Sequence, residues 1–264
     1  GLGAASAGRG ILDYDPNTTR MFLGPSAANA NLDALKKARE LSARRRSPDE
    51  IWSETGWFKG ADDKWRFEID DAGLGFKSDG LSKFKKDPVG RYTLVDDMVQ
   101  HDDLFAAYPG LQNNQHSIQK GDGWGEGSWN GADFSVASRQ QEDMRGILGH
   151  EFQHYVQGKE GFAGGGDPSR FVDITPPDLI PARDAMRAEF MSMRGGSPER
   201  IAKIEEYNSL FDKFTPDGQY RRLAGETESR NVTQRLGMTP AERIETPPWM
   251  TQDFPDSEQI LEQY

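Results

Sequence analysis

The chain has 264 residues, enough to bury a substantial core without disulfides or a structural metal. Its 32 Lys and Arg residues against 43 Asp and Glu residues give a formal net charge of −11, which disfavours binding along nucleic acid because the phosphates would be repelled. With no cysteine and 4 histidines, any metal site must be built from His, Asp and Glu. No apolar run is long enough for a membrane span, and the first ten residues predict neither a secretory signal nor a transit peptide.

The N-terminal third predicts two helices and a hairpin. Apolar residues recur at helical spacing at Leu32, Leu35, Ala38 and Leu41. Ser47-Pro48 with Glu50 three residues after the serine predicts the capped start of a second helix. Residues 57–59 and 64–69 flank a short turn, and the second run alternates aromatic or aliphatic residues with charges. This alternation predicts a β-hairpin with one buried face.

The rest of the chain predicts mainly helices. They are expected over residues 94–105, 140–157, 181–194, 198–214 and 220–236, from periodicity and capping residues. Residues 121–131 contain five glycines and predict an exposed loop, and residues 132–137 alternate as a short strand does. The proline-rich tail from Thr246 is expected to be extended on the surface.

One motif carries chemistry: His150-Glu151-Phe152-Gln153-His154, a His-Glu-x-x-His pattern within the helix predicted at 140–157. Positions i and i+4 project from one side of a helix, so both histidines can bind one Zn²⁺. Glu151 is placed to take a proton from a metal-bound water rather than to bind the metal. The alternative is a surface helix that carries the pattern by chance. Gly146 and Gly149, each costing about 1 kcal/mol relative to alanine in a helix, predict that another element packs closely there.

A catalytic zinc needs a third protein ligand, and no third histidine follows His154 at a suitable distance. A glutamate from a second helix is the other common solution, and residues 223–232 offer Glu226 and Glu228. Two carboxylates two residues apart point about 200° apart on a helix, so only one can bind. We favour Glu228 because the small Ser229 follows it, and keep Glu226 as the alternative.

Four further residues are candidates for the site. Tyr155 and Tyr220 could donate a hydrogen bond to a tetrahedral oxyanion, although a buried structural tyrosine is the competing interpretation for each. His101 and His116 could reach the site, but His101 beside two aspartates is interpreted as a helix-surface residue.

Several stretches, taken together, resemble a known family. They are MFLGPSAANANLDAL, IWSETGWFKGADDKWRFEIDD, HDDLFAAYPGL, GHEFQHYVQGKEGFAGGG, LAGETESRNVTQRLGM and ETPPWMTQDFP. The chain resembles the zincin-like metallopeptidase domains embedded in the very large polyvalent proteins of phages and conjugative elements. The resemblance implies zinc bound by His150, His154 and a glutamate of the GETESR segment, with Glu151 as the base. Gly149 and Ser229 stand where leucine and alanine are expected.

We therefore expect an α+β, zincin-like fold, with a small twisted sheet, a His-Glu-x-x-His helix and a helical C-terminal half. Residues 1–90 are expected to form an N-terminal lead-in packed on a metal-binding domain over residues 91–264. The expected activity is zinc-dependent peptide hydrolysis, with an extended substrate paired to the strand near 134–137 by analogy with other zincins. The expected partners are a protein or peptide substrate and a larger polypeptide or virion assembly, with no nucleic acid and no membrane. The rival hypotheses are a structural zinc in a delivery protein, and an interaction module without metal.

Overall fold

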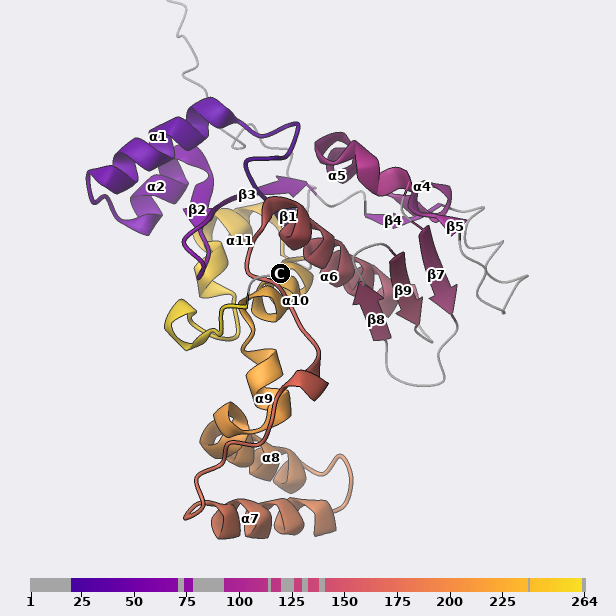
Figure 1. The fold of residues 1–264 in the computed structure, drawn as a ribbon, viewed down its shortest axis with the longest axis vertical. Coiled ribbons are helices and arrows are strands. Elements are labelled where there is room, and N and C mark those ends of the chain that lie inside the picture. The colour runs from indigo at the N-terminus through magenta and orange to yellow at the C-terminus, as the bar shows by residue number, and fades with distance from the viewer. Residues whose placement is uncertain are drawn as a thin grey trace, which may run out of the picture.

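The computed structural model describes residues 20–70, 74–77, 93–113, 115–119, 126–129, 133–137, 141–236 and 238–262. These residues form a mixture of helices and small β-sheets of three, two and four strands (Figure 1). The mixed α and β composition that the sequence predicts is therefore present. None of the described helices is long and apolar enough to cross a bilayer.

The three-stranded sheet contains the predicted hairpin. It consists of β1 (Arg20–Leu23), β2 (Trp57–Lys59) and β3 (Trp65–Asp70), antiparallel in the order β1-β3-β2. The expectation of one buried face is wrong. Arg66 and Glu68 are 2% and 1% exposed, as buried as Phe67 on the opposite face. The charges are buried because residues from the C-terminal part of the chain cover this face and pair with them, for example Arg235 with Glu68.

Ten α-helices lie within the described residues. They are α1 (Leu32–Ala43), α2 (Pro48–Thr55), α4 (Val95–Met98), α5 (Asp102–Ala107), α6 (Gln141–Glu160), α7 (Ile180–Ser192), α8 (Pro198–Phe211), α9 (Pro216–Arg221), α10 (Ala224–Arg235) and α11 (Pro240–Glu245). The predicted capping box at Ser47 is confirmed, with both reciprocal bonds to Glu50. The helix expected over 220–236 is divided, since α9 ends at Arg221 and α10 begins at Ala224.

The helix expected over 94–105 is also divided. A short strand, β6 (Val99–Gln100), separates α4 from α5 and pairs with β4 (Gly75–Phe76). His101 follows this strand as the N-cap of α5, where its Nδ1 accepts a hydrogen bond from the backbone N–H of Leu104 at 3.4 Å. His101 is 1% exposed, so its interpretation as a surface residue is wrong.

The four-stranded sheet has the order β5-β7-β9-β8. Its strands are β5 (Thr93–Leu94), β7 (Gln115–Gln119), β8 (Glu126–Trp129) and β9 (Asp133–Ala137). The strand predicted at 132–137 is confirmed as β9, whereas β8 lies inside the stretch expected to be an exposed loop. β9 pairs with β7 on one side and β8 on the other, so it has no free edge for an extended substrate. His116 lies on β7, and its side chain is outside the described part.

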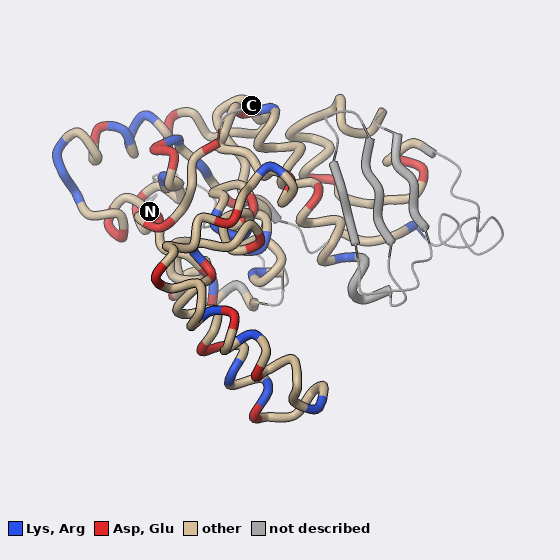
Figure 2. Tube along the Cα trace, turned by 60° about the horizontal axis from the view of Figure 1, so that its bottom comes forward, with Lys and Arg blue, Asp and Glu red and all other residues tan. Residues whose placement is uncertain are grey.

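A single cluster of buried hydrophobic residues joins the three-stranded sheet to α1, α5, α6 and α10, and it draws residues from both sides of residue 90. α6 runs from the four-stranded sheet to the centre of the molecule, where it packs on α10 (Figure 1). α7 and α8 form an arm that extends away from this body (Figure 1). The arm carries interspersed acidic and basic residues, whereas basic residues gather at the end of α1 (Figure 2).

The C-terminal tail lies against the start of α10. The expectation of an extended surface tail is wrong in part, since the tail contains short 3₁₀ helices at Pro248–Met250 and Asp256–Glu258, and Pro248, Thr251 and Phe254 are buried. Ile260 forms an isolated parallel bridge with Leu223, and the backbone N–H of Ala224 donates to the Ile260 carbonyl at 2.9 Å. The Gly164 N–H donates to the Glu262 carbonyl at 3.0 Å. The tail thereby holds the first turn of α10 and the loop after α6 together.

Candidate metal centre

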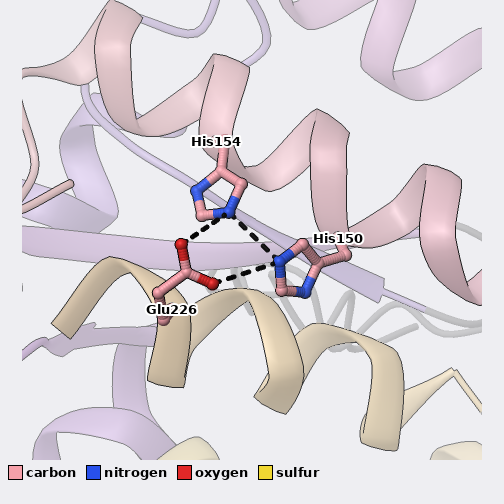
Figure 3. Close-up of side chains that lie close together, drawn as sticks. All are labelled: His150, His154 and Glu226. Atoms are coloured by element: carbon pink, nitrogen blue, oxygen red, sulfur yellow. Dashed lines mark hydrogen bonds and ion pairs between the residues drawn. The ribbon is translucent and has the colours of Figure 1, made fainter. Parts of the chain in front are cut away.

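The two histidines of the His-Glu-x-x-His motif lie one turn apart on α6 and face the same way, as their spacing predicts. Their Nε2 atoms are 3.1 Å apart (Figure 3). His154 is nearly buried, with 8% of its side chain exposed, whereas the His150 side chain is 21% exposed. Solvent therefore reaches the pair from the His150 side.

Glu226, in the first turn of α10, completes the cluster. Its Oε2 lies 3.3 Å from His150 Nε2, and its Oε1 lies 3.4 Å from His154 Nε2 (Figure 3). Burial raises the pKa of the Glu226 carboxyl, but hydrogen bonds and charge from the two histidines outweigh burial and hold this pKa well below its usual range. Within the described residues, these three side chains form the one group of potential metal ligands whose donor atoms converge.

The preference for Glu228 over Glu226 is corrected by this geometry. The Glu228 carboxylate turns away from the histidines, where Oε2 accepts a hydrogen bond from Arg66 Nε and Oε1 accepts one from Gln153 Nε2 at 2.7 Å. The two glutamates point about 200° apart on α10, so one faces the histidines while the other faces the three-stranded sheet. Of the two, only Glu226 is within reach of both Nε2 atoms.

The three donor atoms fit a tetrahedral zinc. Bonds of about 2.0–2.1 Å from a tetrahedral centre place ligand atoms about 3.3–3.4 Å apart. The observed separations of 3.1, 3.3 and 3.4 Å are close to that edge length. Two imidazoles and one carboxylate are also the donor set of catalytic zinc sites that keep a fourth position for water.

Glu151 is buried beside the cluster. Burial raises the pKa of its carboxyl to about 7, the negative charge of Glu226 adds to the rise, and His154 opposes it. A carboxyl that titrates near neutral pH can both accept and release a proton, which is the property required of a general base.

The two candidate tyrosines differ in position. Tyr220, near the end of α9, is half-buried; burial first and then the nearby Glu226 carboxylate raise the pKa of its hydroxyl. Tyr155 lies in the hydrophobic core, where its ring meets that of Tyr108 edge-on at 6.1 Å. The structure therefore brings Tyr220 to the cluster and assigns Tyr155 to packing.

Sequence reasoning did not assign the glycine run at 164–166 to the site. A Cβ atom on Gly165 would lie 2.3 Å from Glu226 Oε1 and 2.5 Å from His154 Cε1. The Gly166 N–H donates to Glu226 Oε1 at 3.2 Å. The loop thus covers the cluster so closely that no side chain fits at Gly165. Three adjacent glycines shortly after α6 were the available signal.

The glycines within α6 do mark a close helix contact, as predicted. A Cβ on Gly146 would meet the Thr233 side chain at 3.2 Å, and one on Gly149 would meet Leu236 at 3.2 Å. Both neighbours belong to α10 or its C-cap. This close packing brings the first turn of α10, with Glu226, to the histidines.

Comparison with known proteins gives one match. Residues 20–77 match the family model of large polyvalent protein associated domain 23. No curated protein and no solved structure matches the chain. The match supports the polyvalent-protein part of the resemblance seen in the sequence. It ends before α6, so the zincin-like part of that resemblance stays a prediction.

Proposed function

We propose that the chain is a zinc-dependent metallopeptidase with a zincin-like fold, and that it forms part of a large polyvalent protein of a phage or mobile element. The observation that carries the proposal is the convergence of His150 Nε2, His154 Nε2 and the Glu226 carboxylate at separations suited to one tetrahedral zinc. The polyvalent context is supported by the family match over residues 20–77.

His150, His154 and Glu226 would hold the zinc, which when bound polarises the scissile carbonyl and lowers the pKa of water. Glu151 accepts the proton of the attacking water and passes it to the leaving amine nitrogen. The Tyr220 hydroxyl lies near Glu226 and is protonated at neutral pH. It would turn from Glu226 to donate a hydrogen bond to the oxyanion that develops on the substrate carbonyl.

The strand expected to pair with the substrate, near 134–137, is paired on both sides, so we assign this role to β8 instead. β8 is the last strand of the four-stranded sheet, so its outer edge is unpaired within the described sheet, and β8 packs against α6. An extended peptide can add to such an edge through main-chain hydrogen bonds. We therefore propose β8 (Glu126–Trp129) as the strand that orients a peptide substrate along the metal helix.

The alternative function is a zinc that only staples the fold. The near-complete burial of His154 and Glu226 at the junction of α6 and α10 favours it, because a metal there would fasten two helices. The two functions differ in what they require of Glu151, which binds no metal in either case. A purely structural zinc needs no general base, whereas hydrolysis does.

The test is Glu151→Gln, which is nearly isosteric. Zinc content should stay equal to that of the wild type, and hydrolysis of a peptide library or of a longer parent chain should fall about 10²–10⁴-fold. Glu205→Gln, at an exposed position on the α8 arm, is the matched control and should leave the rate unchanged. Equal behaviour of zinc-loaded wild type and Glu151→Gln against every peptide pool would reject the peptidase and leave the staple.

A further inference from the structure

The amide orientation of Gln157 on α6 follows from its neighbours. The side chain is fully buried, and its Nε2 lies 2.9 Å from the Gly225 carbonyl oxygen and 3.2 Å from Glu228 Oε1. Both neighbours are acceptors only, so the amide nitrogen must face them. The amide oxygen must then face His154, whose Nδ1 is 2.8 Å away.

This orientation determines where the His154 ring carries its proton. An amide oxygen cannot donate, so the hydrogen bond to Gln157 requires a proton on His154 Nδ1. In a neutral imidazole the other nitrogen is then unprotonated. In that neutral form Nε2 carries the free lone pair. This nitrogen points at His150 Nε2 and Glu226, where a metal would bind.

Glu228 accepts a hydrogen bond from Gln157 and is itself fixed by an ion pair with Arg66. Its Oε2 accepts from Arg66 Nε, and its side chain is 11% exposed. Arg66 in turn donates through Nη1 to Asp62 Oδ1 at 2.7 Å and through Nη2 to Asp62 Oδ2 at 3.1 Å. The guanidinium also lies over the Phe162 ring, 3.8 Å from its centroid. With one face stacked and three nitrogens engaged, Arg66 has a single orientation in which it can hold Glu228.

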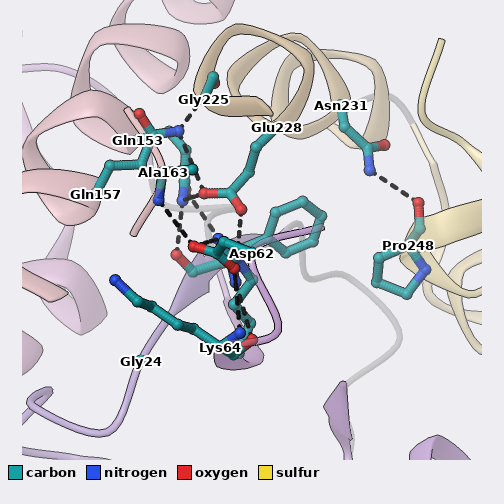
Figure 4. Close-up of polar contacts among 12 residues, drawn as sticks. Gly24, Asp62, Lys64, Gln153, Gln157, Ala163, Gly225, Glu228, Asn231 and Pro248 are labelled. Carbon is teal, nitrogen blue, oxygen red and sulfur yellow. Dashed lines mark hydrogen bonds and ion pairs between the residues drawn. The ribbon is translucent and has the colours of Figure 1, made fainter. Parts of the chain in front are cut away.

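The bonds form one connected chain from the hairpin to the metal helix. Figure 4 shows Glu228 between Gln157 and the hairpin turn that carries Asp62. Asp62 also accepts the backbone N–H of Ala163 at 2.8 Å, at the start of the glycine loop that covers Glu226. Asp62 and Arg66 both belong to the segment matched by the family model. That segment therefore contributes directly to the surroundings of the metal centre.

Burial of these charges has a cost that packing does not require. A buried ion pair is frequently no more stabilising than apolar residues of the same volume, because the desolvation of both charges offsets their attraction. The buried Arg66–Asp62 pair gains a function if the series of hydrogen bonds that starts with it determines the proton position on His154. Outer hydrogen bonds to ligand histidines typically change metal affinity about 10–100-fold.

We propose that Gln157, held by Glu228 and the Arg66–Asp62 pair, is a positioning residue that keeps the proton of His154 on Nδ1 and leaves Nε2 free for a divalent cation. The metal itself rests on the proposed function above, whereas the proton position does not. The proposal also assigns Glu228 a role other than the ligand that its sequence position suggested.

The test compares three variants by zinc titration and by ¹⁵N NMR of the histidine rings in metal-free protein, the NMR at a pH high enough for the His154 ring to be neutral. Gln157→Leu should shift His154 from the Nδ1–H form towards a mixture of both tautomers and weaken zinc about 10–100-fold. Gln157→Glu should keep the Nδ1–H form, because a buried, protonated carboxyl accepts from Nδ1 through one oxygen and donates through the other towards the Gly225 carbonyl or Glu228. This second variant keeps the test valid if the leucine variant does not fold.

Gln153→Leu is the matched control on the same helix. Gln153 is equally buried and also donates to Glu228, but its Oε1 accepts from the Phe22 N–H at 3.3 Å and not from a histidine. It should leave the tautomer and the zinc affinity of the folded protein unchanged. The proposal would be overturned if the Nδ1–H form of His154 persisted in Gln157→Leu or were lost in Gln157→Glu. It would also be overturned if Gln153→Leu lost this form as fully as Gln157→Leu does. A wild-type protein that binds no zinc but shows these tautomers would refute only the proposed function.

Discussion

The Nε2 atoms of His150 and His154 face each other across 3.1 Å. Two lone pairs at this distance repel, so either a proton or a cation must lie between them. Because His154 already carries a proton on Nδ1, the proton between the two Nε2 atoms comes either from His150 or from a second proton on His154, which burial disfavours but the Glu226 carboxylate favours by raising the pKa of His154. A divalent cation would replace that proton and bind both nitrogens together with Glu226. Cation binding should therefore depend on each of these three side chains.

We predict that the chain binds one zinc ion and that His150→Ala abolishes this binding. The variant should stay folded, because the hydrophobic core extends well beyond the cluster. Elemental analysis of protein purified without added metal, followed by zinc titration, measures both. Circular dichroism of the variant separates lost binding from lost folding. Wild-type protein that contains no zinc and shows no tight binding would contradict the prediction.

The second prediction separates the two glutamates of α10. Glu226→Gln should weaken zinc binding by more than about 100-fold, because it removes a charged ligand. Glu228→Gln should weaken it by less than about 10-fold, because the amide oxygen can still accept from Gln157. Titration of both variants under one set of conditions gives the comparison. The opposite order would mean that α10 presents its other face to the histidines.

The position of Ser229 explains why sequence reasoning favoured Glu228, although Glu226 is the glutamate that faces the histidines. A small residue does mark the close contact, since Ser229 is buried and its Oγ lies 3.4 Å from His154 Nδ1. On a helix, residues i and i+3 share a face, whereas neighbours are rotated by about 100°. Ser229 therefore identifies the face of Glu226, not that of Glu228. The spacing of His150 and His154, in contrast, was sufficient because both lie on a single helix.

Arg66 and Glu68 in β3 show a second case in which a local sequence pattern does not identify the partner of a residue. Their alternation with aromatic residues predicts strand β3 correctly, but the pattern does not distinguish a solvated face from one covered by a charged partner. The partners Glu228 and Arg235 lie more than 150 residues further along the chain, so only the tertiary structure brings them together. Local patterns thus predicted most helices and the Ser47 cap, but they missed strand β8 and two helix breaks, and they predicted none of the long-range ion pairs.

The third prediction concerns the glycine loop. Gly165→Ala should weaken zinc binding, because a Cβ at 2.3 Å from Glu226 Oε1 and 2.5 Å from His154 Cε1 must displace one of them. Gly158→Ala is the control, since a Cβ there meets nothing within 4 Å. In the α6 interior it should raise the free energy of unfolding by about 0.5–1 kcal/mol and leave zinc binding unchanged. Equal zinc affinity of both variants would show that the loop tolerates a side chain.

The last prediction tests the second buried ion pair behind the sheet. Arg235 is fully buried, and it donates to both oxygens of Glu68, at 2.7 Å through Nε and 3.1 Å through Nη2. Arg235→Met should lower the free energy of unfolding by about 3–5 kcal/mol, because among the described residues the buried Glu68 charge keeps only Arg243 as a cationic neighbour, at 3.7 Å. Urea unfolding of the metal-free protein measures this loss.

Two further variants show whether the uncompensated charge is the cause. Adding Glu68→Gln to Arg235→Met should recover part of the lost stability, since a neutral amide has a lower desolvation cost and can still accept from Arg243. Arg46→Met makes the same substitution in an exposed pair, where Arg46 and Glu50 have 57% and 47% of their side chains exposed, and it should change stability little. If Arg235→Met is as mild as Arg46→Met, the pair behind the sheet does not hold α10 in place. If the double variant is no more stable than the single one, lost packing rather than the buried charge accounts for the effect.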